Sequence, residues 1–171
     1  MKLMKFLLKK KWQKLQDNLC KEWLKLVVRS VQKINKIYIK TVVKKALDED
    51  LKPKGDITTN LISFKNKKTT AKIIAKQNGI IAGLDFCKAA FKLVGEEAIF
   101  ISKVKDGSKI KKNKVIAEVK ARTKTILIAE RTGLNFLNHA SGIATLTHRF
   151  KQRINKKTKI CCTRKTTPNL R

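Results

Sequence analysis

Hydrophobic positions recur at intervals of three and four residues through the N-terminal part of the chain, which predicts helices with one apolar face. The first run comprises Leu8, Trp12, Leu15, Leu19, Trp23 and Leu26, with lysines at many positions between them. A second run continues through Ile34, Ile37, Tyr38, Val42, Val43, Ala46 and Leu47. Pro53 and Gly55 end this helix, and Asp56 or Thr58 can cap the element that follows.

The pattern then favours strands over two stretches that flank a short helix. Residues 69–84 predict a strand, a turn at Asn78–Gly79 and a second short apolar run. Residues 98–121 predict two or three strands around turns at Asp106–Gly107 and Lys112–Asn113, with alternation at Val115, Ala117 and Val119. The helix between these stretches has apolar positions at Phe86, Ala90, Phe91 and Val94, and Gly95 is its candidate C-cap.

The last part of the chain predicts two helices and a final strand. Residues 123–140 have helical spacing, with Ile128, Leu134 and Leu137 facing inward. Ser141 is a candidate N-cap for a second helix over 141–154, and residues 158–166 predict a strand. The order of elements is helices, then mixed helix and strand, then helices leading into a strand, so the fold class is α+β.

Composition adds a strong positive charge to this outline. The 171 residues include 42 Lys and Arg against 12 Asp and Glu, a formal net charge of +30. Such a field attracts nucleic acid, anionic lipid and small polyanions. The lysines are spread along the whole length, however, which favours a solvated surface. We therefore do not expect nucleic acid to be a partner, and contact of residues 1–40 with a membrane surface stays open.

Cysteine and histidine positions do not predict a metal centre. Cys20, Cys87, Cys161 and Cys162 lack metal-type spacing with either histidine, so we expect free thiols in a reducing cytoplasm. His139 and His148 have no carboxylate or nucleophile at a telling spacing, and we interpret both as structural. No apolar run reaches the length of a membrane span, and residues 1–13 lack the pattern of a signal peptide.

Two groups of charged residues could carry chemistry. Glu130–Arg131 lies in the middle of a predicted helix among apolar neighbours, where charges are costly unless both are partnered; a pair on the helix surface near an interface is the alternative. Thr163, Arg164 and Lys165 follow a short apolar run. A guanidinium fork beside an ammonium suits a carboxylate or phosphate ligand, although both could be ordinary surface cations.

Five stretches together resemble quinolinate phosphoribosyltransferase. They are ALDEDLKPKGDITTNLI, AKIIAKQNGIIAGLDF, KDGSKIKKNKVIAEVKA, LIAERTGLNFLNHASGIATLT and CTRKTTPNLR, in the family's order and spacing. The likeness covers residues 41–171, and residues 1–40 are covered only in part. Cys162 stands where the family usually has Asp, and Asn169 where it usually has Gly.

This resemblance implies an N-terminal α/β sandwich domain, with a mixed sheet and long helices, followed by a C-terminal α/β barrel. Domains are expected at 1–40, a basic amphipathic helical extension; at 41–155, the sandwich domain; and at 156–171, the start of the barrel. Only the first barrel strand is expected, because a barrel takes about 200 residues or more. We therefore expect a truncated chain that is inactive alone.

The resemblance also implies the reaction: quinolinate and phosphoribosyl pyrophosphate give nicotinate mononucleotide, carbon dioxide and pyrophosphate, with Mg²⁺ required. It assigns quinolinate contacts to Thr163, Arg164 and Lys165, with Lys165 as the candidate catalytic residue. Arg131 would reach into the site of a neighbouring subunit, in a dimer or larger oligomer.

Three alternatives to the complete enzyme stay open. The first is a relative linked to molybdenum transport, which has the same fold. The second is a basic protein that binds nucleic acid or a membrane surface. The third is a non-catalytic remnant that dimerises with a full-length copy.

Overall fold

The computed structural model describes residues 34–61, 67–155, 158 and 160. The chain divides into two compact units, Met1–Lys36 and Ile37–Arg171. The domain boundary predicted after residue 40 falls inside helix α2, which spans Lys36–Leu51. The helical run predicted in residues 8–26 and most of the predicted last strand lie outside the described residues.

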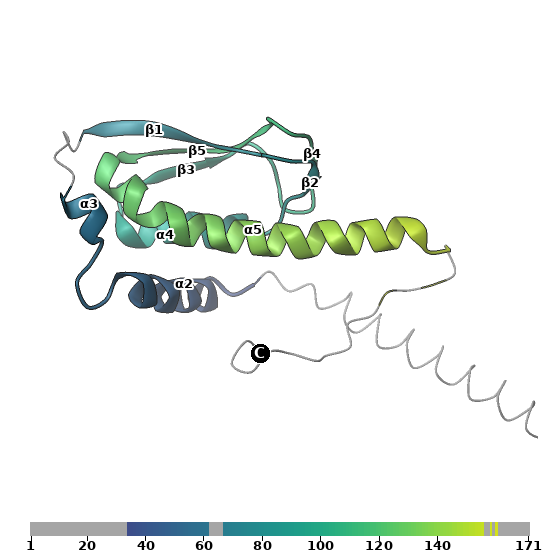
Figure 1. Ribbon diagram of the computed structural model, residues 1–171, viewed down its shortest axis with the longest axis horizontal. Coiled ribbons are helices and arrows are strands. Elements are labelled where there is room, and N and C mark those ends of the chain that lie inside the picture. Colours follow the sequence, from purple (N-terminus) through teal and green to yellow (C-terminus); the bar gives the residue numbers. More distant parts are fainter. Residues whose placement is uncertain (1–33, 62–66, 156–157, 159, 161–171) are drawn as a thin grey trace, which may run out of the picture. The chain divides into compact units, whose positions relative to one another are not determined.

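The described part of the second unit contains helices and two small sheets, which confirms the predicted α+β class (Figure 1). After α2 come α3 (Ile57–Leu61), β1 (Lys68–Ile74), β2 (Gly79–Ile80) and α4 (Leu84–Val94). They are followed by β3 (Ile99–Ser102), β4 (Lys109–Ile110), β5 (Val115–Arg122) and α5 (Thr123–Arg153). None of the helices in the described ranges is long and apolar enough to cross a bilayer.

The main sheet has the strand order β1-β5-β3. Strand β5 is antiparallel to both neighbours, with Thr70 opposite Lys120 and Ile99 opposite Lys120 on the other side. Strands β1 and β3 therefore run parallel to each other with β5 between them, and α4 connects them as in a split βαβ unit. The expectation of a mixed sheet was wrong for the described strands, because every pair in contact is antiparallel.

The chain bends at residues 76–78, just before the turn predicted at Asn78–Gly79, and Gly79 already begins β2; the bend does not join two paired strands. β1 pairs with β5, whereas β2 pairs with β4 in a separate two-stranded sheet. Strand β5 offers eight residues to pair with β1, whereas β2 has two. Strand β1 therefore pairs with β5, which is distant in sequence, and does not form a local hairpin with β2.

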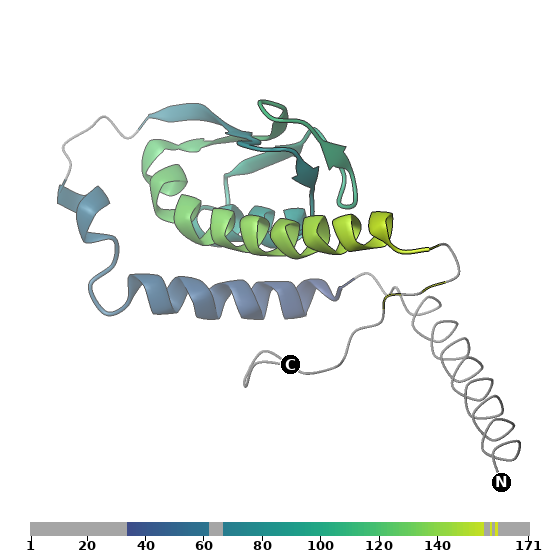
Figure 2. The same cartoon turned by 45° about the vertical axis from the view of Figure 1, so that its right-hand side comes forward.

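The core lies between the main sheet and the pair α4 and α5, which both lie on one face of the sheet (Figures 1 and 2). Alternation in β5 turns Ala117, Val119 and Ala121 inward, where each is at least 96% buried. Phe91 of α4 lies with its ring centroid 6.0 Å from that of Phe100 in β3. Cys87 is free and buried in this core, and burial raises the pKa of its thiol to about 12, so the thiol is unreactive.

The C-terminal helices predicted as two are one helix, α5, which continues from Thr123 through Arg153. Ser141 is therefore not an N-cap. Its hydroxyl accepts a hydrogen bond from the Ala82 N–H (3.0 Å) and donates one to the Ala82 carbonyl (3.1 Å). One turn later, the Thr145 hydroxyl accepts from the Ile80 N–H at 2.9 Å. These two hydroxyls satisfy the backbone at β2, on the side that does not pair with β4.

Helix α2 forms a further layer against α4 and α5. Its buried residues are Ile39, Val43 and Leu47, which pack with Ala90 of α4. The predicted apolar face was partly wrong, because Ile34, Ile37 and Tyr38 are exposed. The chain after α2 turns at Gly55, whose φ is +70°, and Asp56 begins α3 as one of the two predicted caps.

Candidate functional site

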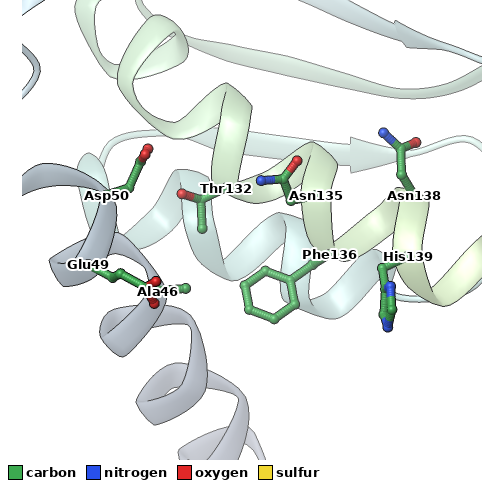
Figure 3. Close-up of a pocket in the computed structure, with 8 residues that line it drawn as sticks. All are labelled: Ala46, Glu49, Asp50, Thr132, Asn135, Phe136, Asn138 and His139. Atoms are coloured by element: carbon green, nitrogen blue, oxygen red, sulfur yellow. The ribbon is translucent and has the colours of Figure 1, made fainter. Parts of the chain in front are cut away.

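A groove of about 910 Å³ runs between α2 and α5 (Figure 3). Three lining residues come from the C-terminal half of α2, namely Ala46, Glu49 and Asp50. The others lie on α5 at helical spacing, namely Thr132, Asn135, Phe136, Asn138 and His139. This spacing of three and four residues places most of them on one side of α5, facing α2.

Packing below the groove fixes the positions of its walls. Phe136 stacks on Phe86 of α4 with ring centroids 5.3 Å apart, and both rings pack against the buried residues of α2. Helices α4 and α5 approach closely at Gly133, where an added Cβ would lie 3.3 Å from the Phe91 ring and 3.4 Å from the Cys87 sulfur. The groove therefore lies above a layer of tightly packed side chains.

Arg131 lies next to this groove and is exposed to solvent. Its Nη1 donates to Asp50 Oδ1 at 3.1 Å, and the two side chains are 71% and 28% exposed. Of the two interpretations left open for Glu130–Arg131, the structure supports the charged pair on the helix surface, because α5 turns both side chains toward solvent and its apolar side chains toward the core. An exposed ion pair contributes only about 0–1 kcal/mol, so the guanidinium can exchange Asp50 for another anion at little cost.

The charge of Arg131 also affects a second carboxylate, that of Asp56. Asp56 accepts hydrogen bonds from the Thr59 hydroxyl (2.6 Å) and the Thr59 N–H (2.9 Å). These bonds lower the pKa of Asp56, and the positive charge of Arg131 adds to the effect, while partial burial opposes it. The cap keeps this carboxylate ionised at the start of α3.

The lining of the groove does not suit a small dianion by itself. It combines the carboxylates of Glu49 and Asp50 with the amides of Asn135 and Asn138 and the imidazole of His139. Two carboxylates repel an anionic ligand, whereas amides and carboxylates together accept hydrogen bonds from donors. The arrangement suits an exposed interface with Arg131 at its margin rather than a complete anion pocket.

Most of the predicted site lies beyond the part of the chain that the structure describes. This holds for Thr163, Arg164 and Lys165, so among the predicted site residues the structure places Arg131. The described ranges hold no group of three or more His, Cys, Asp or Glu residues that could bind a metal ion.

Sequence reasoning missed Asp50 as the partner of Arg131 and missed the groove. The spacing of Thr132, Asn135, Phe136 and His139 could have indicated a shared face on α5. Nothing in the sequence pairs Asp50 with Arg131, because 81 positions separate them. His139, interpreted as structural, lines the groove and is exposed.

Two family models match the chain in succession. The N-terminal domain of quinolinate phosphoribosyl transferase matches residues 56–141, and the C-terminal domain of the same family matches residues 143–171. The second match begins inside α5, ahead of the predicted boundary at residue 156.

Curated relatives agree with this assignment. A probable nicotinate-nucleotide pyrophosphorylase [carboxylating] of Methanocaldococcus jannaschii is 41% identical over 139 residues, covering 79% of this chain and 47% of the relative. One of Bacillus subtilis is 37% identical, covering 81% of this chain and 47% of the relative. The chain spans about half the length of these relatives.

Solved structures show the same fold. NadC from Streptococcus pyogenes superimposes with a TM-score of 0.75 at 33% identity, covering 80% of this chain and 50% of that one. The nicotinate-nucleotide pyrophosphorylase from Ehrlichia chaffeensis gives 0.69 at 38% identity, covering 76% and 47%. Because the N-terminal family model alone matches half of the residues, and the C-terminal one follows it in register, this chain belongs to the quinolinate phosphoribosyl transferase family.

Proposed function

We propose that this chain contributes to the transfer of a phosphoribosyl group from phosphoribosyl pyrophosphate to quinolinate. The products are nicotinate mononucleotide, carbon dioxide and pyrophosphate, in NAD biosynthesis. The observation that carries the proposal is the successive match of the N- and C-terminal family models over residues 56–171. Relatives with 37–41% identity have names that describe a carboxylating pyrophosphorylase, which supports the same reaction.

Arg131 is proposed to bind substrate in the active site of a second subunit. Its exposure and its weak pairing with Asp50 leave the guanidinium able to meet a carboxylate or phosphate. Thr163, Arg164 and Lys165 are proposed to contact quinolinate from the other subunit, with Lys165 as the catalytic residue. Each active site then needs two chains, and the smallest active assembly is a homodimer.

Mg²⁺ is proposed as the metal of the reaction, acting on the pyrophosphate oxygens, since hard cations prefer oxygen ligands. The described residues contain no group of three or more His, Cys, Asp or Glu side chains that could hold it. A cytoplasmic location is proposed as well, and the free thiol of Cys87 fits a reducing compartment.

A chimera tests the reaction directly. The chain is fused at residue 171 to the remainder of the Bacillus subtilis relative, and nicotinate mononucleotide is measured by mass spectrometry. We expect product formation that depends on both substrates and on Mg²⁺. Arg131→Ala should lower kcat/KM by roughly 100-fold or more, as loss of a charged contact in a dry site does. Arg149→Ala is the matched control on α5 and should leave the rate unchanged. A folded, dimeric chimera without product would refute the reaction.

Mixing two inactive chimeras tests the shared site. One carries Arg131→Ala and the other Lys165→Ala, and the subunits are allowed to exchange. If Arg131 acts across a two-fold interface, half of the dimers are mixed and each has one intact site, so roughly a quarter of the activity returns. If both residues act within one chain, every site lacks one of them and no activity returns.

A further inference from the structure

The outer face of the main sheet is uncovered by any described helix. Helices α4 and α5 lie on the inner face, while the outer face is open (Figure 2). The exposure pattern along β1 alternates strictly, with its inward positions packed on the core. The register places outward positions side by side, since Lys68 lies opposite Arg122 and Thr70 opposite Lys120.

This face is strongly basic. We define the basic sheet face by five exposed cations and one exposed hydroxyl: Lys68, Lys72, Lys103, Lys120, Arg122 and Thr70. The facing carboxylate is Glu118, which lies opposite Lys72 and forms an ion pair with Lys103 at 3.3 Å. Because that pair is internally neutral, Lys68, Lys72, Lys120 and Arg122 remain as the net charge of the face.

Further cations continue from the ends of the same two strands. The segment after β1 and the segment before β5 are joined by backbone hydrogen bonds, from Ala75 N–H to the Lys114 carbonyl (2.9 Å) and from Asn113 N–H to the Ala75 carbonyl (2.8 Å). This joined turn holds exposed ammonium groups, those of Lys76, Lys111, Lys112 and Lys114. The carboxylate of Asp106 lies instead at the start of α4, where it accepts hydrogen bonds from the Gly83 and Leu84 N–H groups.

The cations of this face form two rows along neighbouring strands. Alternate residues of a strand lie about 6.6–6.8 Å apart. A nucleic-acid strand carries a negative charge on the phosphate of every nucleotide. Lys68 and Lys72 on β1, and Lys120 and Arg122 on β5, form two adjacent rows of cations that can contact such phosphates, and the Thr70 hydroxyl between the two lysines can donate to a phosphate oxygen.

We propose that the basic sheet face binds the sugar–phosphate backbone of nucleic acid without reading its sequence. The exposed side chains of this face are cations, Thr70 and two isoleucines, so they offer no aromatic ring on which a base could stack. Ile74 and Ile99 lie on the two outer strands, on opposite sides of β5, and do not form the continuous apolar surface that insertion into a membrane requires. Composition alone argued against such a partner, because lysines are spread along the chain; the sheet register brings them together.

The test measures binding of the full 171-residue chain to a fluorescein-labelled duplex of arbitrary sequence, by anisotropy, across a range of salt concentrations. A triple variant, Lys72→Gln with Lys120→Gln and Arg122→Gln, removes three cations of the face. The matched control removes three exposed lysines of α2 by Lys40→Gln, Lys44→Gln and Lys45→Gln. A third variant, Lys72→Arg with Lys120→Arg, keeps the charge and checks that the face tolerates substitution.

We expect the plot of log affinity against log salt to become less steep by about 2–3 for the triple variant, since each phosphate contact contributes about 0.9. The control should change this slope by less than about one, and the arginine variant should keep it. Equal losses in the triple variant and the control would overturn the proposal, as would a triple variant that binds the duplex like the parent. Vesicles of anionic and neutral lipid form the second arm, and a loss confined to vesicle binding would assign the face to a membrane instead.

Discussion

Gly133 and Gly142 lie on the same helix, α5, in different surroundings. An added Cβ at Gly133 would lie within 3.6 Å of atoms from three α4 residues, whereas at Gly142 it would meet nothing within 4 Å. We expect Gly133→Val to lower the free energy of unfolding by about 1–3 kcal/mol through overpacking. Gly142→Val should change it by less than about 0.5 kcal/mol. Urea denaturation of both variants checks this, and equal stabilities would contradict a close α4–α5 contact.

Asp56 gives stability a dependence on pH. Its pKa is lowered in the folded state, chiefly by the Thr59 hydroxyl, so the ionised carboxylate stabilises the folded protein. The contribution is complete above the unfolded-state pKa of about 3.9 and is lost as the pH falls through the lower folded value. Asp56→Ala should cost about 0.5–1 kcal/mol at pH 6. The difference from the parent should shrink below pH 4 in denaturation curves; a constant difference would refute the role of ionisation.

Local residue roles were accessible from sequence where the partner is near in the chain. Asp56 precedes its partner Thr59 by three positions, so cap chemistry predicts the contact. The cap at Gly95 was likewise predicted and is confirmed, although its φ of −149° is extended rather than left-handed. Arg131 shows the limit, since its partner is set by how α2 packs on the other helices and not by any local rule.

At the scale of elements, α5 holds strand β2 through side-chain hydroxyls. Thr145→Val keeps the shape of the side chain but leaves the Ile80 N–H without its partner. We expect a loss of about 1–3 kcal/mol, because a half-buried donor loses its acceptor. Thr147→Val is the matched control, since that exposed hydroxyl donates to the Ile143 carbonyl within the helix and its removal should be nearly neutral. Thermal unfolding of the two variants separates them, and similar melting temperatures would argue against the tie to β2.

A similar hydrogen bond, made by Ser141, explains why the single helix α5 was predicted as two helices. A serine in a helical pattern commonly marks an N-cap, because its hydroxyl competes for backbone donors. The Ser141 hydroxyl instead bonds the backbone of Ala82, in the segment between β2 and α4, and the helix continues. The prediction of strand pairing failed for a related reason. Gly79 and Ile80 pair with Ile110 and Lys109, and this choice of partner strand is determined only in the assembled sheet. Alternation predicted the strands themselves, because the buried face follows directly from the period of two.

At the scale of the whole molecule, the sequence predicted the class and the family well, because five separated stretches agree in order. It predicted the site less well, since Thr163, Arg164 and Lys165 lie outside the described residues and the groove beside Arg131 is formed by α2 and α5 together. Which faces of α2 and α5 lie opposite each other is determined by how the helices pack. The apolar face of α2 shows this effect: Ile39 is buried, whereas Ile37 and Tyr38 are exposed.

The two cores of the described unit should differ in stability. The smaller core joins Ile39, Val43 and Leu47 of α2 to Ala90, while the larger one fills the space between the sheet and α4 and α5. Because few buried side chains hold α2, we expect its amides to exchange with deuterium through local opening, at a lower free energy than those of β5.

Leu47→Ala should cost about 2–5 kcal/mol of this local stability and speed exchange in α2 while β5 stays protected. Val119→Ala, in the larger core, should speed exchange in β5 and leave the local opening of α2 largely unchanged. Hydrogen-exchange mass spectrometry measures α2 and β5 in separate peptides. If Leu47→Ala accelerated α2 and β5 equally, α2 would be part of a single cooperative unit, and the groove beside Arg131 would be as rigid as the sheet.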